Sequence, residues 1–202
     1  LRLVSPVSGL FADKDLARKV ADVSVSLEGR PDYPEFFFEW RDQISHIHFS
    51  EPSLDIHVPW GDEQRDAVER AIEVVGEGLQ ALSFHLSRDF VDCAKNARGH
   101  YLAGDSRLEI VEMHRNAEEN TGWLRNRTDC QILFENNNYF ATGAYEVITL
   151  PKVIADLVKS HADGLLLDLA HAQVSSENRH QPLMSYLDAL ITCEVQQVHV
   201  SK

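Results

Sequence analysis

The segment from Gly164 to Asn178 constrains the fold more than any other part of the chain. It opens with a continuous apolar run, Leu165 to Leu167, which is typical of a strand buried on both faces of a parallel sheet. Asp168 and His171 follow at the carboxyl end of this run. Two such side chains are costly to bury unless something pairs with them. A divalent metal ion bound by both side chains would offset this cost. A hydrogen bond between Asp168 and His171 in a loop would also offset it.

Strand and helix patterns alternate along the rest of the chain, which predicts an α/β protein with a parallel sheet. We count about seven strands when the neighbouring candidates 44–49 and 54–59 are merged. The strand candidates are 1–7, 23–27, 44–49, 54–59, 81–86, 131–134, 165–167 and 195–200. Helical patterns cover 13–20, 62–79, 108–125, 150–160 and 182–191, and the apolar segment 35–43 fits either a helix or a strand.

Polar residues end one strand candidate after another: Glu28, His57, His85, Glu135, Asp168 with His171, and His199. Core packing alone rarely gives such a series, and a ring of strands would bring these side chains to one mouth. We therefore predict a (β/α)8 TIM barrel rather than an open doubly wound sheet. The barrel forms one domain over residues 1–202. About seven strands are too few to close it, so we expect the domain to lack its last strand or strands.

The predicted mouth carries imidazoles and carboxylates without cysteine. This donor set suits two or three ions of iron, manganese or zinc. The three cysteines lie far apart and form no CxxC pair, so neither a zinc ribbon nor a disulfide framework is expected, and a cytoplasmic setting is the default. The net charge of −13 argues against nucleic acid as the partner. No apolar run is long enough to span a membrane.

Several segments resemble the multinuclear non-haem iron oxidases, the family that includes the enzyme of methanobactin biosynthesis. The resemblance is strongest from 131 to 200. It rests on Phe134-Glu135-Asn136 with Tyr139, Leu165-Leu166-Leu167-Asp168, Asn178, Tyr186-Leu187 and Val198-His199-Val200, together with Ile56-His57-Val58 and Ser83-Phe84-His85-Leu86.

The resemblance implies a barrel like that of xylose isomerase with two or three irons. His57, His85, Glu135, Asp168 and His199 would be ligands, Glu135 would bridge two irons, and Glu135 with Asp168 would serve catalysis directly. Such enzymes use dioxygen to oxidise a Cys or Asp of a ribosomally made peptide, which a partner protein often presents.

One departure from that family opens a second interpretation. Ala170 stands where the family has asparagine, and Asp168-x-x-His171 is similar instead to endonuclease IV and its sugar-isomerase relatives. His171 would then be a zinc or manganese ligand of a metal-dependent isomerase or phosphodiesterase. A barrel that only binds a partner is a third interpretation. Six histidines are expected not to be ligands: His46, His48, His100, His114, His161 and His180.

Overall fold

Seven strands of the computed structural model form one parallel sheet, in which strand order follows chain order from β1 to β7. The structure describes residues 5–7, 23–27, 44–50 and 52–200. The strands are β1 (Ser5–Val7), β2 (Val23–Leu27), β3 (Ile44–Phe49), β4 (Ala81–Leu86), β5 (Gln131–Asn136), β6 (Gly164–Asp168) and β7 (Val195–His199). The predicted α/β class and parallel sheet are confirmed. Glu28, the predicted helix 13–20 and the apolar segment 35–43 lie outside the described residues.

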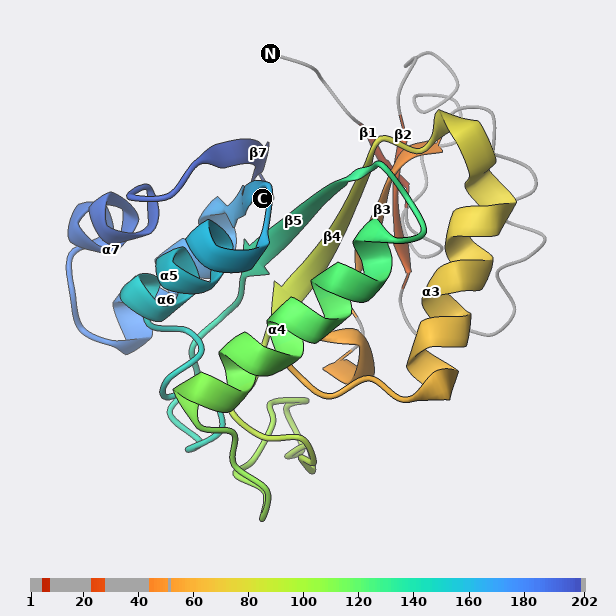
Figure 1. Ribbon diagram of the computed structural model, residues 1–202. Helices are drawn as coiled ribbons and strands as arrows, with labels where there is room; N and C mark the ends of the chain where they lie inside the picture. Colours follow the sequence, from red (N-terminus) through yellow and green to blue (C-terminus); the bar gives the residue numbers. More distant parts are fainter. Residues whose placement is uncertain (1–4, 8–22, 28–43, 51, 201–202) are drawn as a thin grey trace.

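Five α-helices of the described residues alternate with the later strands. They are α3 (Asp62–Val75), α4 (Ile110–Arg125), α5 (Pro151–His161), α6 (Leu169–Asn178) and α7 (Leu183–Leu190). Two short 3-10 helices, η1 (Pro52–Leu54) and η2 (Gly76–Gly78), flank α3. Figure 1 shows α4 running in front of the strands and α3 standing beside β3 at the right of the view.

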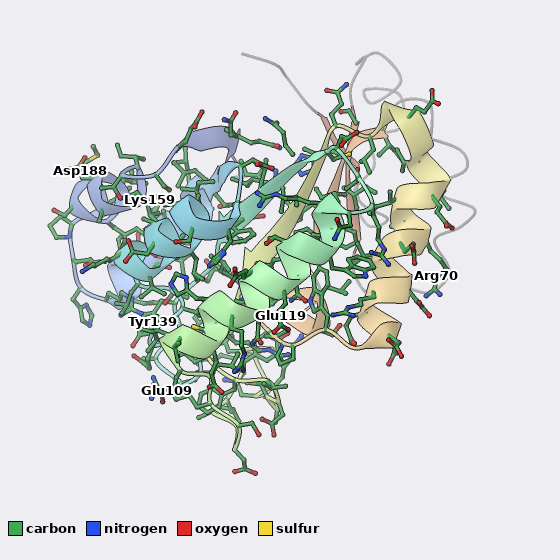
Figure 2. The ribbon with its side chains drawn as sticks, viewed as in Figure 1. Arg70, Glu109, Glu119, Tyr139, Lys159 and Asp188 are labelled. Atoms are coloured by element: carbon green, nitrogen blue, oxygen red, sulfur yellow. The ribbon has the colours of Figure 1, made fainter. Side chains whose placement is uncertain are left out.

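Helices α3 and α4 each have a charged side and an apolar side. Arg70 on α3 and Glu119 on α4 are exposed, and both are labelled among the surface side chains in Figure 2. Val68 on α3 and Ala117 on α4 are instead fully buried in the large apolar core. Because residues on one face of a helix recur every three or four positions, each helix packs one apolar stripe inward and leaves its charges in solvent.

The two faces of the sheet differ because side chains alternate along a strand. On β4, Leu82 and Phe84 belong to the large apolar core, which also holds buried residues of the helices. Ser83 and His85 occupy the alternate positions of the same strand, on the opposite, inner face. The same alternation on β5 places Glu135 on the inner face. The helices therefore cover the apolar face, and the inner face carries the polar side chains.

The sheet is strongly curled. The imidazole rings of His48 on β3 and His199 on β7 lie 5.7 Å apart, between centroids. Four strand spacings separate β3 from β7, which amounts to about 19 Å in a flat sheet. Side chains of the two strands can meet only if the sheet curves around its inner face, as the wall of a barrel does.

The segment from Leu54 to Pro59 is not the strand that its alternation predicts. It forms the end of η1 followed by turns. Helix α4 supplies the reason, because Asn120 donates to the carbonyl of Val58 at 2.8 Å and Asn116 donates to the carbonyl of His57 at 3.1 Å. These side chains satisfy backbone groups that a strand would have paired with a neighbour.

Asp168 ends β6 and caps α6, which begins at the next residue. Its carboxylate accepts a hydrogen bond from the backbone N–H of His171 at 2.8 Å. This N-cap contact, together with the direct passage from strand to helix, places Asp168 and His171 on one helical turn. Gly164 begins the same strand, and a Cβ there would clash with the side chain of Gln196 on β7. A glycine is thus required for the close approach of β6 and β7.

No helix among the described residues is both long enough and apolar enough to cross a membrane.

Candidate metal centre

Glu135 lies at the centre of the polar inner face, with 1% of its surface exposed. Its Oε2 atom lies 3.1 Å from Nε2 of His48 and 3.4 Å from Nε2 of His85. Its Oε1 atom lies 3.5 Å from Nδ1 of His171 and 3.7 Å from Nδ1 of His199. Four imidazoles from four different elements therefore surround one buried carboxylate.

The parallel register of the sheet creates this convergence. His85 on β4 is the register partner of Glu135 on β5, and Asp168 on β6 is the partner of His199 on β7. In a parallel sheet all carboxyl ends lie at the same edge, so residues late in each strand meet there. The structure thus brings these four residues together, at the strand ends where the sequence predicts a shared site.

Two sets of three side chains have the proximity that a metal ion requires. The first comprises His48, His85 and Glu135, and the second comprises Glu135, Asp168 and His199. In each set, one ligand atom per residue lies within 4.8 Å of the others. Glu135 belongs to both sets, and a carboxylate has two oxygens with which to bridge a pair of ions.

The first set fits a metal ion in its donor separations as well as its donor types. Nε2 of His48 lies 3.1 Å from Nε2 of His85, so the three donor atoms form a triangle with edges of 3.1, 3.1 and 3.4 Å. Ligand atoms bound about 2.1 Å from one ion lie about 3.0–3.4 Å apart at octahedral or tetrahedral angles. Oε2 of Glu135 is also buried, with the two imidazole nitrogens as its near polar neighbours. A cation would satisfy this oxygen.

The protonation states of two members of this set, His48 and Glu135, suit a cation. Burial lowers the pKa of His48 to about 3, although Glu135 acts in the opposite direction. Burial opposes ionisation of Glu135, but His48 and His85 hold the pKa of this carboxyl well below its usual range. Burial also works against protonation of His85, yet Glu135 raises the pKa of that imidazole above its ordinary value. Near neutral pH the centre thus offers a neutral His48 and an ionised Glu135, the forms that bind metals.

Ser83 orients His48 from the side opposite Glu135. Its hydroxyl lies 2.7 Å from Nδ1 of His48 and 2.8 Å from Nε2 of His46. A hydroxyl can accept from one ring nitrogen and donate to another. This contact leaves Nε2 of His48 directed toward Glu135, which is the arrangement that fixes a metal-binding tautomer in proteins.

His171 stands beside the two sets rather than inside either. Its Nδ1 atom lies 2.8 Å from the carbonyl oxygen of Asn136 and 4.0 Å from Oδ1 of Asp168. If Nδ1 carries the proton, it donates to that carbonyl, and Nε2 remains the ring nitrogen with a free lone pair. The side chain keeps 21% of its surface exposed, so it borders the open part of the centre.

His57 does not join the centre, contrary to the sequence prediction, and His48 does. His57 is fully buried in the turns after β3, and its Nε2 atom lies 2.8 Å from the carbonyl oxygen of Arg88. The prediction took His57 for a strand-end residue, but its segment is not a strand. The signal for His48 was present in the sequence, because His46 and His48 alternate on one face of 44–49. The two sets of the described residues also leave out His100, His114, His161 and His180.

Comparisons with known proteins bear on the fold. No protein-family model matches the sequence, and no curated protein sequence matches it. Similar solved structures are a mannonate dehydratase from Streptococcus suis, endonuclease IV from Thermus thermophilus and the 3-keto-D-glucoside 4-epimerase from E. coli. Their TM-scores are 0.59, 0.55 and 0.57, at 12%, 16% and 11% sequence identity.

These similarities extend over nearly the whole chain. They cover 98%, 98% and 100% of it, and 72%, 76% and 80% of the three other chains, respectively. The chain therefore shares the fold of these structures, a curled parallel α/β sheet of the TIM-barrel type, with seven strands among the described residues. At these identities the comparison establishes the fold and leaves the reaction to the site.

Proposed function

We propose that this chain is a metal-dependent enzyme whose centre would hold two ions, with Glu135 as a ligand available to both. One observation carries the proposal: two three-residue donor sets share this single buried carboxylate. His48 and His85 would complete one position, and Asp168 and His199 the other.

The finer proposal is an iron-dependent oxidase that modifies a Cys or Asp of a ribosomally made peptide, which a partner protein would deliver. Bound iron would supply Lewis acidity and the electrons that dioxygen chemistry requires. The chain's own residues would hold the substrate and manage protons. His171, partly exposed and anchored on the carbonyl of Asn136, faces the open side of the centre, where a substrate thiol or carboxylate would approach.

A metal-dependent sugar isomerase or phosphodiesterase is the second candidate. The Asp168–His171 pair on one helical turn supports it. The similar solved structures also support it, because their names describe a dehydratase, an endonuclease and an epimerase. In this alternative, zinc or manganese would occupy the same donor sets, and no dioxygen would be consumed.

Metal content after anaerobic purification from iron-replete cells separates the candidates. Iron at about two ions per chain, with oxygen uptake on addition of peptide, supports the oxidase. Zinc or manganese without oxygen uptake, accompanied by isomerisation of sugars or cleavage of a phosphodiester bond, supports the second candidate. A chain that retains no metal at all would overturn both.

A further inference from the structure

Two loops at the carboxyl ends of β4 and β5 form a second structural unit above the metal centre. They comprise residues 87–109 and 137–150, and Figure 1 shows them together beyond the arrowheads of the two strands. Phe90, Tyr139, Ala144 and Tyr145 form a small apolar core between them. The backbone N–H of Tyr101 also donates to the hydroxyl of Tyr145 at 2.8 Å. The loops are therefore packed against each other as a built surface.

An open pocket of about 550 Å³ lies on this surface, within the range of small-molecule sites. Its lining comes from the first loop, the second loop and the end of α6. Among the described residues that line it, none is acidic and three are basic: Arg98, His100 and His180. This local excess of basic groups contrasts with the net charge of −13 for the chain.

The basic residues are held in place by specific contacts. Oδ1 of Asn96 accepts hydrogen bonds from the backbone N–H groups of Arg98 and His100, at 2.9 and 3.0 Å. The ring of His100 stacks on Phe140 with centroids 3.7 Å apart and planes 10° from parallel. The guanidinium of Arg98 forms no ion pair within the described part of the chain and stands free to bind a ligand.

His180 provides an independent indication that side chains are placed here for binding. Its φ angle is +53°, in the left-handed region, and it is the one non-glycine residue with positive φ that the described residues contain. A left-handed backbone conformation is strained for any residue other than glycine. At this position, just beyond the end of α6, glycine would be the less strained residue. The chain carries a histidine there, and the imidazole lines the pocket.

We propose that this pocket is a subsite for a carboxylate of the substrate. A guanidinium matches a carboxylate through two parallel hydrogen bonds, and imidazole N–H groups add further donors. The stacked pair of His100 and Phe140 would carry the apolar part next to the carboxylate. The proposal rests on the function proposed above, because it takes the metal centre as the place of reaction.

Helix α6 sets the distance between the two sites. Its ten residues begin directly after Asp168 and include His171 in the first turn, next to the metal centre. The helix ends at Asn178, which lines the pocket. A helix of this length spans about 15 Å. An extended peptide covers that distance with about four or five residues. The subsite would therefore accept an acidic residue, or the terminal carboxylate, about four or five positions from the residue that reacts.

The test uses peptides that contain one Cys and one Glu separated by two to seven Gly-Ser spacer residues, each paired with a Gln counterpart. Binding to the metal-loaded protein is followed by NMR, through the Nε–H signal of Arg98 and the amide signals of His100 and Thr142. We expect the Glu peptides to bind more tightly than the Gln peptides. The difference should be clearest when Glu lies about four or five positions from Cys, that is, with three or four spacer residues between them. The Arg98→Gln variant should lose this preference, with binding at least about tenfold weaker.

Two further variants separate binding from folding. Arg115→Gln removes an exposed arginine of α4 that does not line the pocket, and should leave the preference unchanged. His180→Gly relieves the left-handed backbone, so it should not lower the melting temperature, and yet it should weaken the binding of the Glu peptides. Equal binding of Glu and Gln peptides, or an unchanged preference in Arg98→Gln, would overturn the proposal.

Competition with free anions tests whether the pocket prefers a carboxylate or a phosphate. Displacement of the peptide by acetate or citrate, and not by inorganic phosphate, supports a carboxylate subsite. Preferential displacement by inorganic phosphate would contradict it and point to a phosphorylated substrate. The titration is repeated with the metal-free protein, to separate the carboxylate subsite from the proposed oxidase function. Arg98-dependent binding of the Glu peptides should persist there, even if the oxidase assignment fails.

Discussion

Asn136 pairs with the backbone of Asp168 through both ends of its side-chain amide. Its Oδ1 atom accepts from the N–H of Asp168 at 2.9 Å, and its Nδ2 group donates to the carbonyl of Asp168 at 3.0 Å. The carbonyl of Asn136 also contacts Nδ1 of His171 at 2.8 Å. One fully buried residue, next to Glu135 in the chain, thus fixes the backbone of Asp168 and contacts the ring of His171.

Replacing Asn136 with alanine should weaken metal binding about 10- to 100-fold, as loss of a group that orients ligands typically does. The reason is that Asp168 loses both contacts that fix its backbone. Titration of the metal-free protein with Zn²⁺ or Fe²⁺ measures the affinity. Asn126→Ala is the matched control, since Asn126 is exposed at the end of α4 and its side chain donates to the carbonyl of Gly122, away from the centre. Equal affinities of the two variants would contradict this positioning role.

Glu135→Gln and Asp168→Asn should differ in the number of ions they lose. Glu135 belongs to both donor sets, so its substitution should weaken both positions. Asp168 belongs to one set, so its substitution should remove one ion and leave the position at His48 and His85 filled. Elemental analysis after dialysis gives the stoichiometry. Loss of the same number of ions in both variants would show that Glu135 is not shared.

His48→Gln and His57→Gln form a pair that tests which histidine of this region binds metal. His48→Gln should lower metal content because Nε2 of His48 faces Oε2 of Glu135 at 3.1 Å. His57→Gln should keep the metal but lower the melting temperature, since the buried ring contacts the carbonyl of Arg88. A buried group left without its partner costs about 1–3 kcal/mol. Loss of metal in His57→Gln with normal metal content in His48→Gln would reverse the assignment.

The contact between α4 and α5 should make stability depend on pH. Nδ1 of His114 lies 2.9 Å from Nε2 of His161, and burial, followed by His114, lowers the pKa of His161 below 6.5. Arg125 acts in the same direction and Glu118 against it. A histidine with a lowered pKa in the folded state stabilises the fold above its unfolded pKa of 6.5. That contribution is lost as the pH falls.

The measurement is the melting temperature of the wild type and of His161→Gln at several values between about pH 8 and pH 5. The wild type should lose more stability on acidification than the variant, which has no imidazole at this contact. Parallel curves for the two proteins would contradict the prediction.

Local patterns in the sequence were enough to predict the segments that form the seven strands and four of the five described α-helices, but they missed α6 and wrongly made 54–59 a strand. The apolar run from Leu165 to Leu167 could only be buried on both faces, and its position before Asp168 placed that carboxylate at a strand end. The same reasoning located His85, Glu135 and His199, because each follows an apolar segment whose period fixes its direction. Chemistry confined to strand ends of a parallel sheet is therefore visible in one sequence.

Only the tertiary structure decided between His48 and His57. Both follow apolar residues in alternating segments, so a local pattern cannot separate them. The decision depends on Asn116 and Asn120 of α4, which bind the backbone around His57 and prevent a strand there. The curl of the sheet was equally invisible, since it brings His48 on β3 within 5.7 Å of His199 on β7, between ring centroids. Contacts between residues so far apart in the chain arise from packing of the whole sheet, which no local period encodes.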